Sequence, residues 1–421
     1  MRARLADRSR GARAAYVAQL ALTLARRWAR TPAPLKIAAI YLAARAVTTT
    51  LMIVAALQST SLSRFGADPG LGDFVVGWDA QWYWLVAEEG YPSTLPLTDS
   101  GDVAENAWAF MPVFAYAARG IGFLLGSWGA GALLLSFAAG YLACLALDRL
   151  LRDRIGRAAA LWAVTFFAFG PLAAMFQVGY AETLFLLLLF LALDATIRRR
   201  YAWLYLLVPV MAFTRPGILA FALYLGLHGI VRFLRRRDDP LLPREVVHIV
   251  ALGALAVACG FAWQVIAGVV TGDPGAYLAT ELAWRRLWII GGVEGFVPFE
   301  GWVQASSFWF AQWGLPTEWG PVALVLLVIA LAAALLLLPQ VHRVGADLRL
   351  WSASYLLYLL LVFFPQSSTF RLLLPLSPLW GAVAVPRSRL WRLGVLVLCV
   401  VGQWIWIFHI YALGNRFWQV P

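Results

Sequence analysis

Long apolar runs alternate with short polar segments along the chain, and this pattern predicts a helical membrane protein. The first run, residues 37–58, is about as long as the ~20 residues that a helix needs to cross a bilayer. Ten further apolar segments follow at 129–148, 158–176, 180–197, 203–214, 216–233, 246–270, 320–338, 350–364, 372–386 and 393–413. We therefore predict an all-α polytopic membrane protein with about eleven spans.

The polar connections are of two kinds, which predicts the orientation in the membrane. Short connections rich in arginine recur at 149–157, 198–200, 232–244, 342–349 and 387–392, and the N-terminal segment 1–36 is basic as well. Because Lys and Arg are enriched in cytoplasmic loops, we place these connections and the N-terminus in the cytoplasm. The two long connections, 59–128 and 271–320, carry acidic and aromatic residues and are expected outside.

Four apolar segments differ from simple spans. Residues 110–126 are apolar, but a crossing there would move the basic 149–157 connection outside, so we predict an interfacial or re-entrant helix. The pair 203–214 and 216–233 is short and interrupted by Pro209 and Pro216, which predicts broken helices beside a buried polar cavity. In the basic N-terminal segment, residues 14–24 are expected to form a helix on an anionic membrane surface.

The chain then divides simply. Residues 1–36 form a basic cytoplasmic segment, 37–413 a single transmembrane domain and 414–421 an extracytoplasmic tail. The localisation expected from this arrangement is a multi-pass protein of the plasma membrane.

Composition excludes several classes of protein. The chain is 62% hydrophobic and only 13% charged, whereas soluble domains carry about 25% charged residues. Soluble enzymes, secreted scaffolds and disordered proteins are therefore excluded. The net charge of +12 comes from arginines in short loops without a continuous basic face, so we expect no nucleic-acid partner. Cys144, Cys259 and Cys399 lie apart inside apolar runs, which predicts neither a disulfide nor a metal site.

The first outside loop contains the densest polar and aromatic cluster, Gly77-Trp78-Asp79-Ala80-Gln81-Trp82-Tyr83-Trp84, followed by Glu88 and Glu89. Asp79 and Tyr83 lie one helical turn apart on the same face. A carboxylate among aromatic rings at the membrane edge is suited to general-base chemistry, and the rings can stack on sugars. The alternative is an interfacial aromatic belt with an aspartate that caps a helix.

Other charged residues are expected at the outer ends of spans or within the bilayer. Arg371 lies on the outer side, where it could bind a lipid phosphate, or else contact a headgroup or a loop acid. Arg215, between the two short spans, is either a second phosphate ligand or the structural partner of Glu182. For Glu182 the alternative is a role only in stabilising the N-terminus of its helix. For Arg285 and Arg286 a solvated loop face is the better interpretation.

The order of the motifs resembles one known family. The series consists of Trp78-Asp79, Trp82-Tyr83, Gly90-Tyr91, Phe110-Met111-Pro112, Tyr180-Ala181-Glu182, Thr214-Arg215-Pro216-Gly217, Asp273-Pro274-Gly275 and Arg371-Leu372-Leu373-Leu374-Pro375-Leu376-Ser377-Pro378-Leu379. Over residues 77–380 it resembles the PIG-V-like mannosyltransferases of the GT-C class of membrane glycosyltransferases. Met111, Ala115 and Ala181 depart from the family pattern, which indicates a divergent member.

The resemblance implies a GT-C-like helical bundle that transfers a sugar, mannose by analogy, from a polyprenyl-phosphate donor. It assigns Asp79 the role of catalytic base in an inverting reaction. We expect Arg371 and Arg215 to stabilise the departing phosphate. Residues expected to contact the sugar or the acceptor are Trp78, Trp82, Tyr83, Glu88, Glu89, Tyr180 and Glu182. No cofactor is required, although Glu88 and Glu89 would permit a divalent cation.

The expected acceptor is a hydroxyl of a glycolipid, a glycan or a protein on the extracytoplasmic side. The rival function is that of a transporter or flippase of lipid-linked sugars. Such proteins commonly contain paired repeats with charges in corresponding halves. The sequence contains no clear repeat, and the first outside loop is longer than a transporter needs, so we favour the enzyme.

Overall fold

The computed structural model of the protein describes residues 30–286 and 295–416, together with Gln19, Thr23, Arg27 and Trp28. Across these residues the regular elements are helices, with a single isolated bridge between Leu97 and Val103 and no strand. The predicted all-α membrane class is thus confirmed. Most of the segment 14–24, where a surface helix is expected, and most of the 414–421 tail lie outside the described residues.

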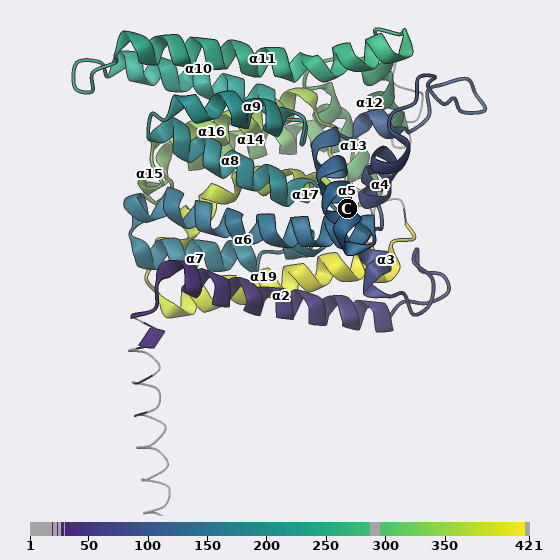
Figure 1. Ribbon diagram of the computed structural model, residues 1–421, viewed down its shortest axis with the longest axis horizontal. Coiled ribbons are helices and arrows are strands. Elements are labelled where there is room, and N and C mark those ends of the chain that lie inside the picture. Colours follow the sequence, from purple (N-terminus) through teal and green to yellow (C-terminus); the bar gives the residue numbers. More distant parts are fainter. Residues whose placement is uncertain (1–18, 20–22, 24–26, 29, 287–294, 417–421) are drawn as a thin grey trace, which may run out of the picture.

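Each of the predicted spans contains a helix, and the longest helices lie side by side as a bundle (Figure 1). In chain order, the helices of the predicted spans are α2 (Ala33–Leu57), α6 (Trp128–Ile155), α7 (Arg157–Ala168), α8 (Glu182–Ile197), α9 (Leu204–Ala212), α10 (Ile218–Leu234), α11 (Pro243–Thr271), α14 (Trp319–Leu337), α16 (Ala346–Val362), α18 (Trp380–Ala384) and α19 (Arg389–Ile407). Among the described residues, five are long and apolar enough to cross a membrane, namely α2, α6, α11, α14 and α19 with its continuation to Leu413. The full count of about eleven crossings stays a prediction.

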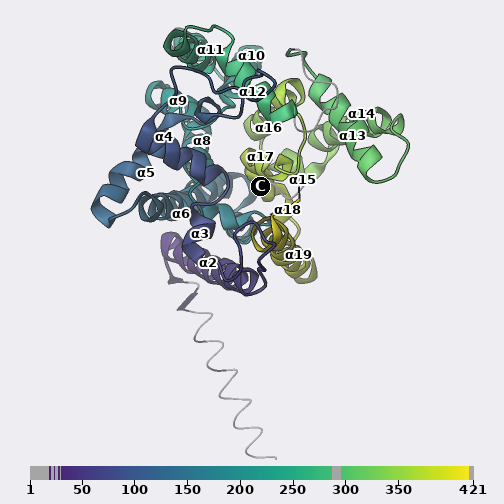
Figure 2. The same ribbon diagram turned by 90° about the vertical axis from the view of Figure 1, so that its right-hand side faces the viewer.

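Short helices of the two long connections cover one end of the bundle (Figures 1 and 2). They are α3 (Leu71–Val75), α4 (Asp79–Glu89), α5 (Pro112–Leu125) and α12 (Ala276–Arg286), and α17 (Thr369–Leu372), which follows α16, lies at the same end. Helix α13 (Glu300–Gln312) pairs instead with α14 in an arm at the side of the bundle (Figure 2). The long connections therefore gather at the same end.

Helix α5 is the apolar segment that was predicted not to cross, and it lies across the ends of the bundle helices (Figure 2). Gly126, with φ of +88°, ends α5, and the Ser127 hydroxyl then caps α6 by accepting from the Ala130 amide at 3.2 Å. A side chain at Gly131 would collide with the Ala118 carbonyl oxygen. Glycine thus lets α5 fold back directly onto the start of α6.

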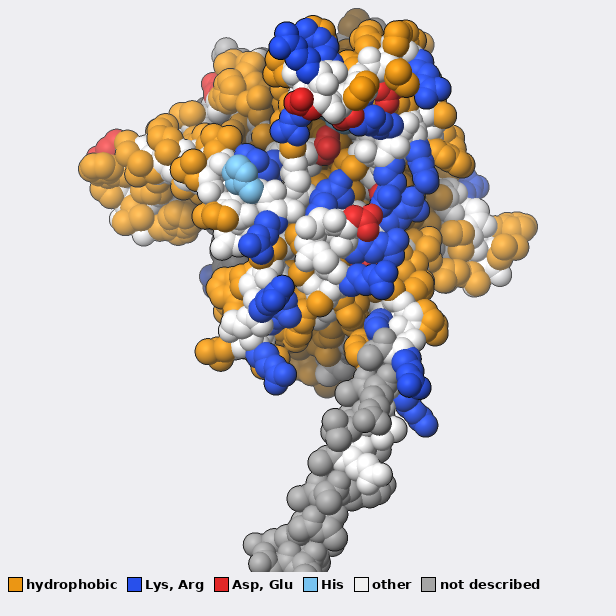
Figure 3. All heavy atoms as spheres, turned by 90° about the vertical axis from the view of Figure 1, so that its left-hand side faces the viewer, with side chains coloured by type: hydrophobic (Ala, Val, Ile, Leu, Met, Phe, Trp, Pro, Cys, Tyr) orange, Lys and Arg blue, Asp and Glu red, His pale blue; other side chains and the backbone are white. Residues whose placement is uncertain are grey.

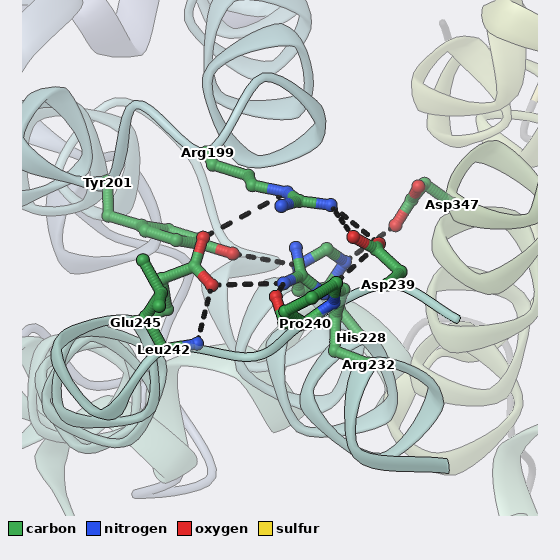
Figure 4. Close-up of polar contacts among 9 residues, drawn as sticks. All are labelled: Arg199, Tyr201, His228, Arg232, Asp239, Pro240, Leu242, Glu245 and Asp347. Atoms are coloured by element: carbon green, nitrogen blue, oxygen red, sulfur yellow. Dashed lines mark hydrogen bonds and ion pairs between the residues drawn. The ribbon is translucent and has the colours of Figure 1, made fainter. Parts of the chain in front are cut away.

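The opposite end of the bundle carries the basic connections, and arginines are spread over it (Figure 3). A network of ion pairs joins several helices there (Figure 4). Arg232 on α10 pairs with Glu245 on α11 at 3.0 Å, and His228 Nδ1 lies 2.7 Å from Asp347 on α16. Basic and acidic connections are therefore separated to opposite ends, as the charge pattern predicted, and this network fastens α10, α11 and α16 together at the basic end.

Arg45 is a buried cation inside the bundle. Arg45 of α2 is 3% exposed and donates to the Ala168 carbonyl oxygen at 2.6 Å and to the Ala173 carbonyl oxygen. These carbonyls belong to the last turn of α7 and to the 3₁₀ turn Ala173–Gln177, where helical partners are missing. Arg45 thereby satisfies backbone groups where a membrane helix ends within the protein.

The predicted orientation can be tested by labelling single introduced cysteines on intact cells with an impermeant maleimide. In a variant without the native cysteines, exposed Ser100→Cys and Asp273→Cys at the α4 and α5 end should react, because that end is predicted outside. Exposed Asp238→Cys at the basic end should react only after permeabilisation. Labelling of Asp238→Cys and Ser100→Cys from the same side would contradict the predicted topology.

Candidate active site

Four charged side chains meet at the end of the bundle covered by α4 and α5. Asp79 begins α4, Glu182 begins α8, Arg215 lies in the break between α9 and α10, and Arg371 lies in α17. Nη1 of Arg215 is 2.9 Å from Oε1 of Glu182, and Nη1 of Arg371 is 3.3 Å from the same oxygen. The same Nη1 of Arg371 also pairs with Oδ2 of Asp79. We call Asp79, Glu182, Arg215 and Arg371 the four-charge cluster.

Helix lengths indicate where the cluster lies along the bundle. Helices α8 and α10 begin beside the cluster and extend to the basic end with 16 and 17 residues, whereas α11 has 29. At 1.5 Å per residue, α8 and α10 are about 24–26 Å long and α11 about 44 Å. Helix α11 is therefore long enough to extend beyond the level of the cluster.

Local backbone geometry places Asp79 at the start of α4. A side chain at Gly77 would collide with the ring of Phe65 at 2.5 Å. Trp78 has φ of +56°, a conformation that costs a residue other than glycine about 1–3 kcal/mol. Its indole donates to the Ile410 carbonyl oxygen at 3.0 Å, which holds the strained turn in place. The carboxylate of Asp79 consequently lies at a helix N-terminus, where the dipole favours negative charge.

Tyr180 supports both members of the Asp79–Arg371 pair. Its hydroxyl accepts a hydrogen bond from the Asp79 amide at 3.1 Å, and the Arg371 guanidinium lies 5.2 Å from the centre of its ring. Two aromatic residues of α16 hold the chain after Arg371: Tyr355 donates to the Leu372 carbonyl oxygen at 2.8 Å and Trp351 donates to that of Pro375 at 2.9 Å. The backbone after Arg371 is thus held by α16, and its guanidinium lies against the ring of Tyr180.

The helix break predicted around Pro216 brings Arg215 into the cluster. Helix α9 ends at Ala212, and Gly217 has φ of +129°, which only glycine adopts readily. Arg215 is 8% exposed and Glu182 2%. The structural pairing of these two residues, one of the two alternatives for Arg215, is therefore present, and it lies next to Arg371.

An aromatic wall flanks the cluster. Trp82 stacks on Phe110 with ring centres 5.7 Å apart, and Trp284 of α12 meets Trp82 edge-on at 5.9 Å. Tyr83 packs behind this wall against Phe110 and Phe114. Burial raises the pKa of Tyr83, and the charge of Glu182 adds to the rise, so this phenol stays neutral. Trp284 was missed at the sequence level, where only the adjacent arginines drew attention.

Other predicted site residues lie away from the cluster. Glu88 and Glu89 are exposed at the end of α4, about 14 Å along the helix from Asp79. Glu88 lines a separate hollow of about 590 Å³ together with Tyr116 and Arg119. Within the described ranges, no group of three or more His, Cys, Asp or Glu side chains could hold a metal ion together.

Arg285 and Arg286 are not the solvated loop face that was favoured for them. Arg285 donates to the Val362 carbonyl oxygen and Arg286 to that of Val103, so both are half-buried. Since Arg286 lies in the second long connection and Val103 in the first, this contact ties the two connections together. Asn106 does the same by donating to the Thr280 hydroxyl at 2.9 Å. These two contacts hold the first and second long connections against each other.

Glu105 lies in this tie, and burial raises its pKa above the ordinary value of 4.5, with the charge of Asp79 adding to the rise. Above pH 4.5 the folded protein therefore holds this proton when the unfolded chain has lost it, and the free energy of unfolding falls as pH increases. We predict that Glu105→Gln removes this loss. In detergent, its Tm should exceed that of the parent by more at pH 7 than at pH 4.5. Exposed Glu318→Gln is the matched control, and an equal difference at both pH values would contradict the prediction.

No family model and no curated protein matches the chain. Among solved structures it is similar to the oligosaccharyltransferase of Archaeoglobus fulgidus. The crystal structure with Zn and sulfate is 15% identical with a TM-score of 0.43, over 88% of this chain and 53% of that chain. The AglB structure with an inhibitory peptide and a dolichol-phosphate is 14% identical with a TM-score of 0.35, over 89% and 56%. The chain thus spans about half the length of these proteins, and a likeness at these scores assigns no role to its residues.

Proposed function

We propose that the protein is a membrane glycosyltransferase of the GT-C class that transfers a sugar from a polyprenyl-phosphate donor to an acceptor hydroxyl on the extracytoplasmic side. The sugar is mannose by the family resemblance. The observation that carries the proposal is the direct pairing of Asp79 with Arg371 next to a wall of aromatic rings. A carboxylate for proton transfer and a guanidinium for a phosphate are the two groups that such a transfer requires.

In the proposed reaction, the acceptor oxygen attacks the anomeric carbon while Asp79 takes the hydroxyl proton. The bond between the anomeric carbon and the phosphate oxygen breaks on the opposite face, and its electron pair leaves with the polyprenyl phosphate. The configuration of the sugar is therefore inverted. Arg371 and Arg215 stabilise the negative charge that develops on the leaving phosphate, a contribution that is usually large.

The surroundings of the cluster divide the remaining roles. Trp82, in the aromatic wall, is proposed to pack on the sugar. Trp78, Tyr83 and Tyr180 hold the wall and the charged residues from behind. Glu88 and Glu89, exposed further along α4, are proposed to contact the acceptor rather than the donor phosphate.

The direct test is transfer of radiolabelled mannose from polyprenyl-phosphate mannose by the purified protein in lipid vesicles, with a panel of membrane lipids and peptides as acceptors. We expect a labelled product and release of polyprenyl phosphate. A flippase of lipid-linked sugars would instead move the donor across the vesicle membrane and form no product, which would overturn the proposal.

We predict that Asp79→Asn abolishes transfer, because the amide keeps the shape of the carboxylate but cannot accept the proton. Loss of a general base typically lowers kcat by about 10²–10⁴-fold. The measurement is initial transfer rate with purified variants of equal Tm, and Asp99→Asn in the exposed part of the same loop is the control. Turnover of Asp79→Asn equal to that of the parent would exclude Asp79 as the base.

We further predict that Arg371→Lys is impaired although it keeps the positive charge. A compact ammonium cannot reproduce the two parallel hydrogen bonds of a guanidinium to a phosphate. We expect kcat/KM for the donor to fall by about 100-fold or more, whereas Arg416→Lys, exposed at the same end, should be unaffected. Unchanged dependence on donor concentration in Arg371→Lys and Arg371→Ala would exclude the phosphate role.

A further inference from the structure

The side chain of Arg371 is shared between two acids through one nitrogen atom. Its Nη1 contacts Oδ2 of Asp79 and lies 3.3 Å from Oε1 of Glu182. Among the described residues, its Nε is buried and has no hydrogen-bond partner. A buried guanidinium with an unused donor is under-satisfied, and such groups in folded proteins call for an explanation.

This pairing occupies part of each group that the proposed reaction uses. One of the two carboxylate oxygens of Asp79, Oδ2, is engaged by Arg371. One of the two terminal nitrogens of Arg371, Nη1, is engaged by Asp79 in turn. The cluster is also neutral, with two acids and two arginines, so a bound phosphate competes with Asp79 for the positive charge. Donor binding therefore favours separation of the pair.

Glu182 differs from Asp79 in being a fixed member of the cluster. Its side chain is 2% exposed against 19% for Asp79, and it is the first residue of α8. Arg215 pairs with it at 2.9 Å. This contact has the distance of an ion pair without the geometry of a hydrogen bond, and among the described residues both oxygens of Glu182 lack a hydrogen-bond partner. Glu182 can accordingly accept more from Arg371 than it now does.

We infer that Glu182 is a positioning residue that anchors Arg371 while this arginine passes from Asp79 to the donor phosphate. Before the donor binds, Arg371 holds Asp79. When the phosphate arrives, Arg371 turns about its contact with Glu182 to meet it, and Asp79 is released to accept the acceptor proton. The base is thus exposed only when the donor is in place. This inference rests on the proposed function, because it requires a phosphate donor.

The test is equilibrium binding of decaprenyl phosphate to the full chain in phosphatidylcholine nanodiscs, where no transfer occurs. If Asp79 competes with the phosphate for Arg371, Asp79→Asn should bind decaprenyl phosphate more tightly than the parent, by about fivefold to tenfold. Glu182→Gln should bind it about tenfold more weakly, because Arg371 loses its anchor. In the double variant the loss caused by Glu182→Gln should shrink, since Asp79 no longer competes. Glu318→Gln, exposed near the start of α14, is the matched control.

A purely structural role for Glu182 predicts no interaction between the two substitutions. Equal or weaker binding by Asp79→Asn, or unchanged or tighter binding by Glu182→Gln, would overturn the inference. Should Glu182→Gln fail to fold, Glu182→Asp, which keeps the charge but draws the carboxylate back from Arg371, replaces it, and the same weakening is expected. Failure of the parent to bind decaprenyl phosphate above the level of phosphatidylcholine would instead overturn the proposed donor, and so can be distinguished from failure of the exchange.

Discussion

Opposite charges that neutralise each other inside the protein hold together the end of the bundle at which α4 and α5 lie. A charged side chain away from water is costly unless an opposite charge lies against it. Glu182 and Arg215 are almost completely buried, and they pair with each other and, through Glu182, with Arg371. Glu182 reaches this position because α8 begins with it, and Arg215 because the chain leaves the helical conformation between α9 and α10. The helix start and the helix break thus bring opposite charges together.

The two ends of the bundle use charge in different ways. At the basic end, the ion pairs of Arg232 with Glu245 and of His228 with Asp347 bridge neighbouring helices and fasten them together (Figure 4). At the other end, the four-charge cluster brings two acids to one nitrogen of Arg371. Nε of Arg232 at the basic end lacks a hydrogen-bond partner among the described residues, but the cluster holds three such atoms, both oxygens of Glu182 and Nε of Arg371. Buried polar atoms without partners call for an explanation, and a bound ligand is one.

Next to the four-charge cluster, Trp78 has a backbone conformation that stability alone would not favour. Trp78 occupies the left-handed region next to Asp79, and it is held there by its hydrogen bond to Ile410 and by the guanidinium of Arg64, 4.1 Å from the centre of its ring. Strain of this kind persists where the surrounding structure over-determines it, and it is concentrated at functional sites. Residues distant in sequence therefore cooperate to present a single carboxylate.

The sequence by itself determined the class of protein, the helical segments and the separation of basic from acidic connections, because these depend on local hydrophobicity and charge. The segment 246–270, for example, begins three residues after the start of α11 and ends one residue before its end. Only the tertiary structure decided which charges meet. Arg371 and Asp79 are 292 residues apart, and Arg45 lies within an apolar run that gives no sign of its backbone partners. In a bilayer the lipid is as apolar as the helices, so hydrophobic periodicity does not reveal which helix faces pack together. The contacts of a buried charge are decided by that packing.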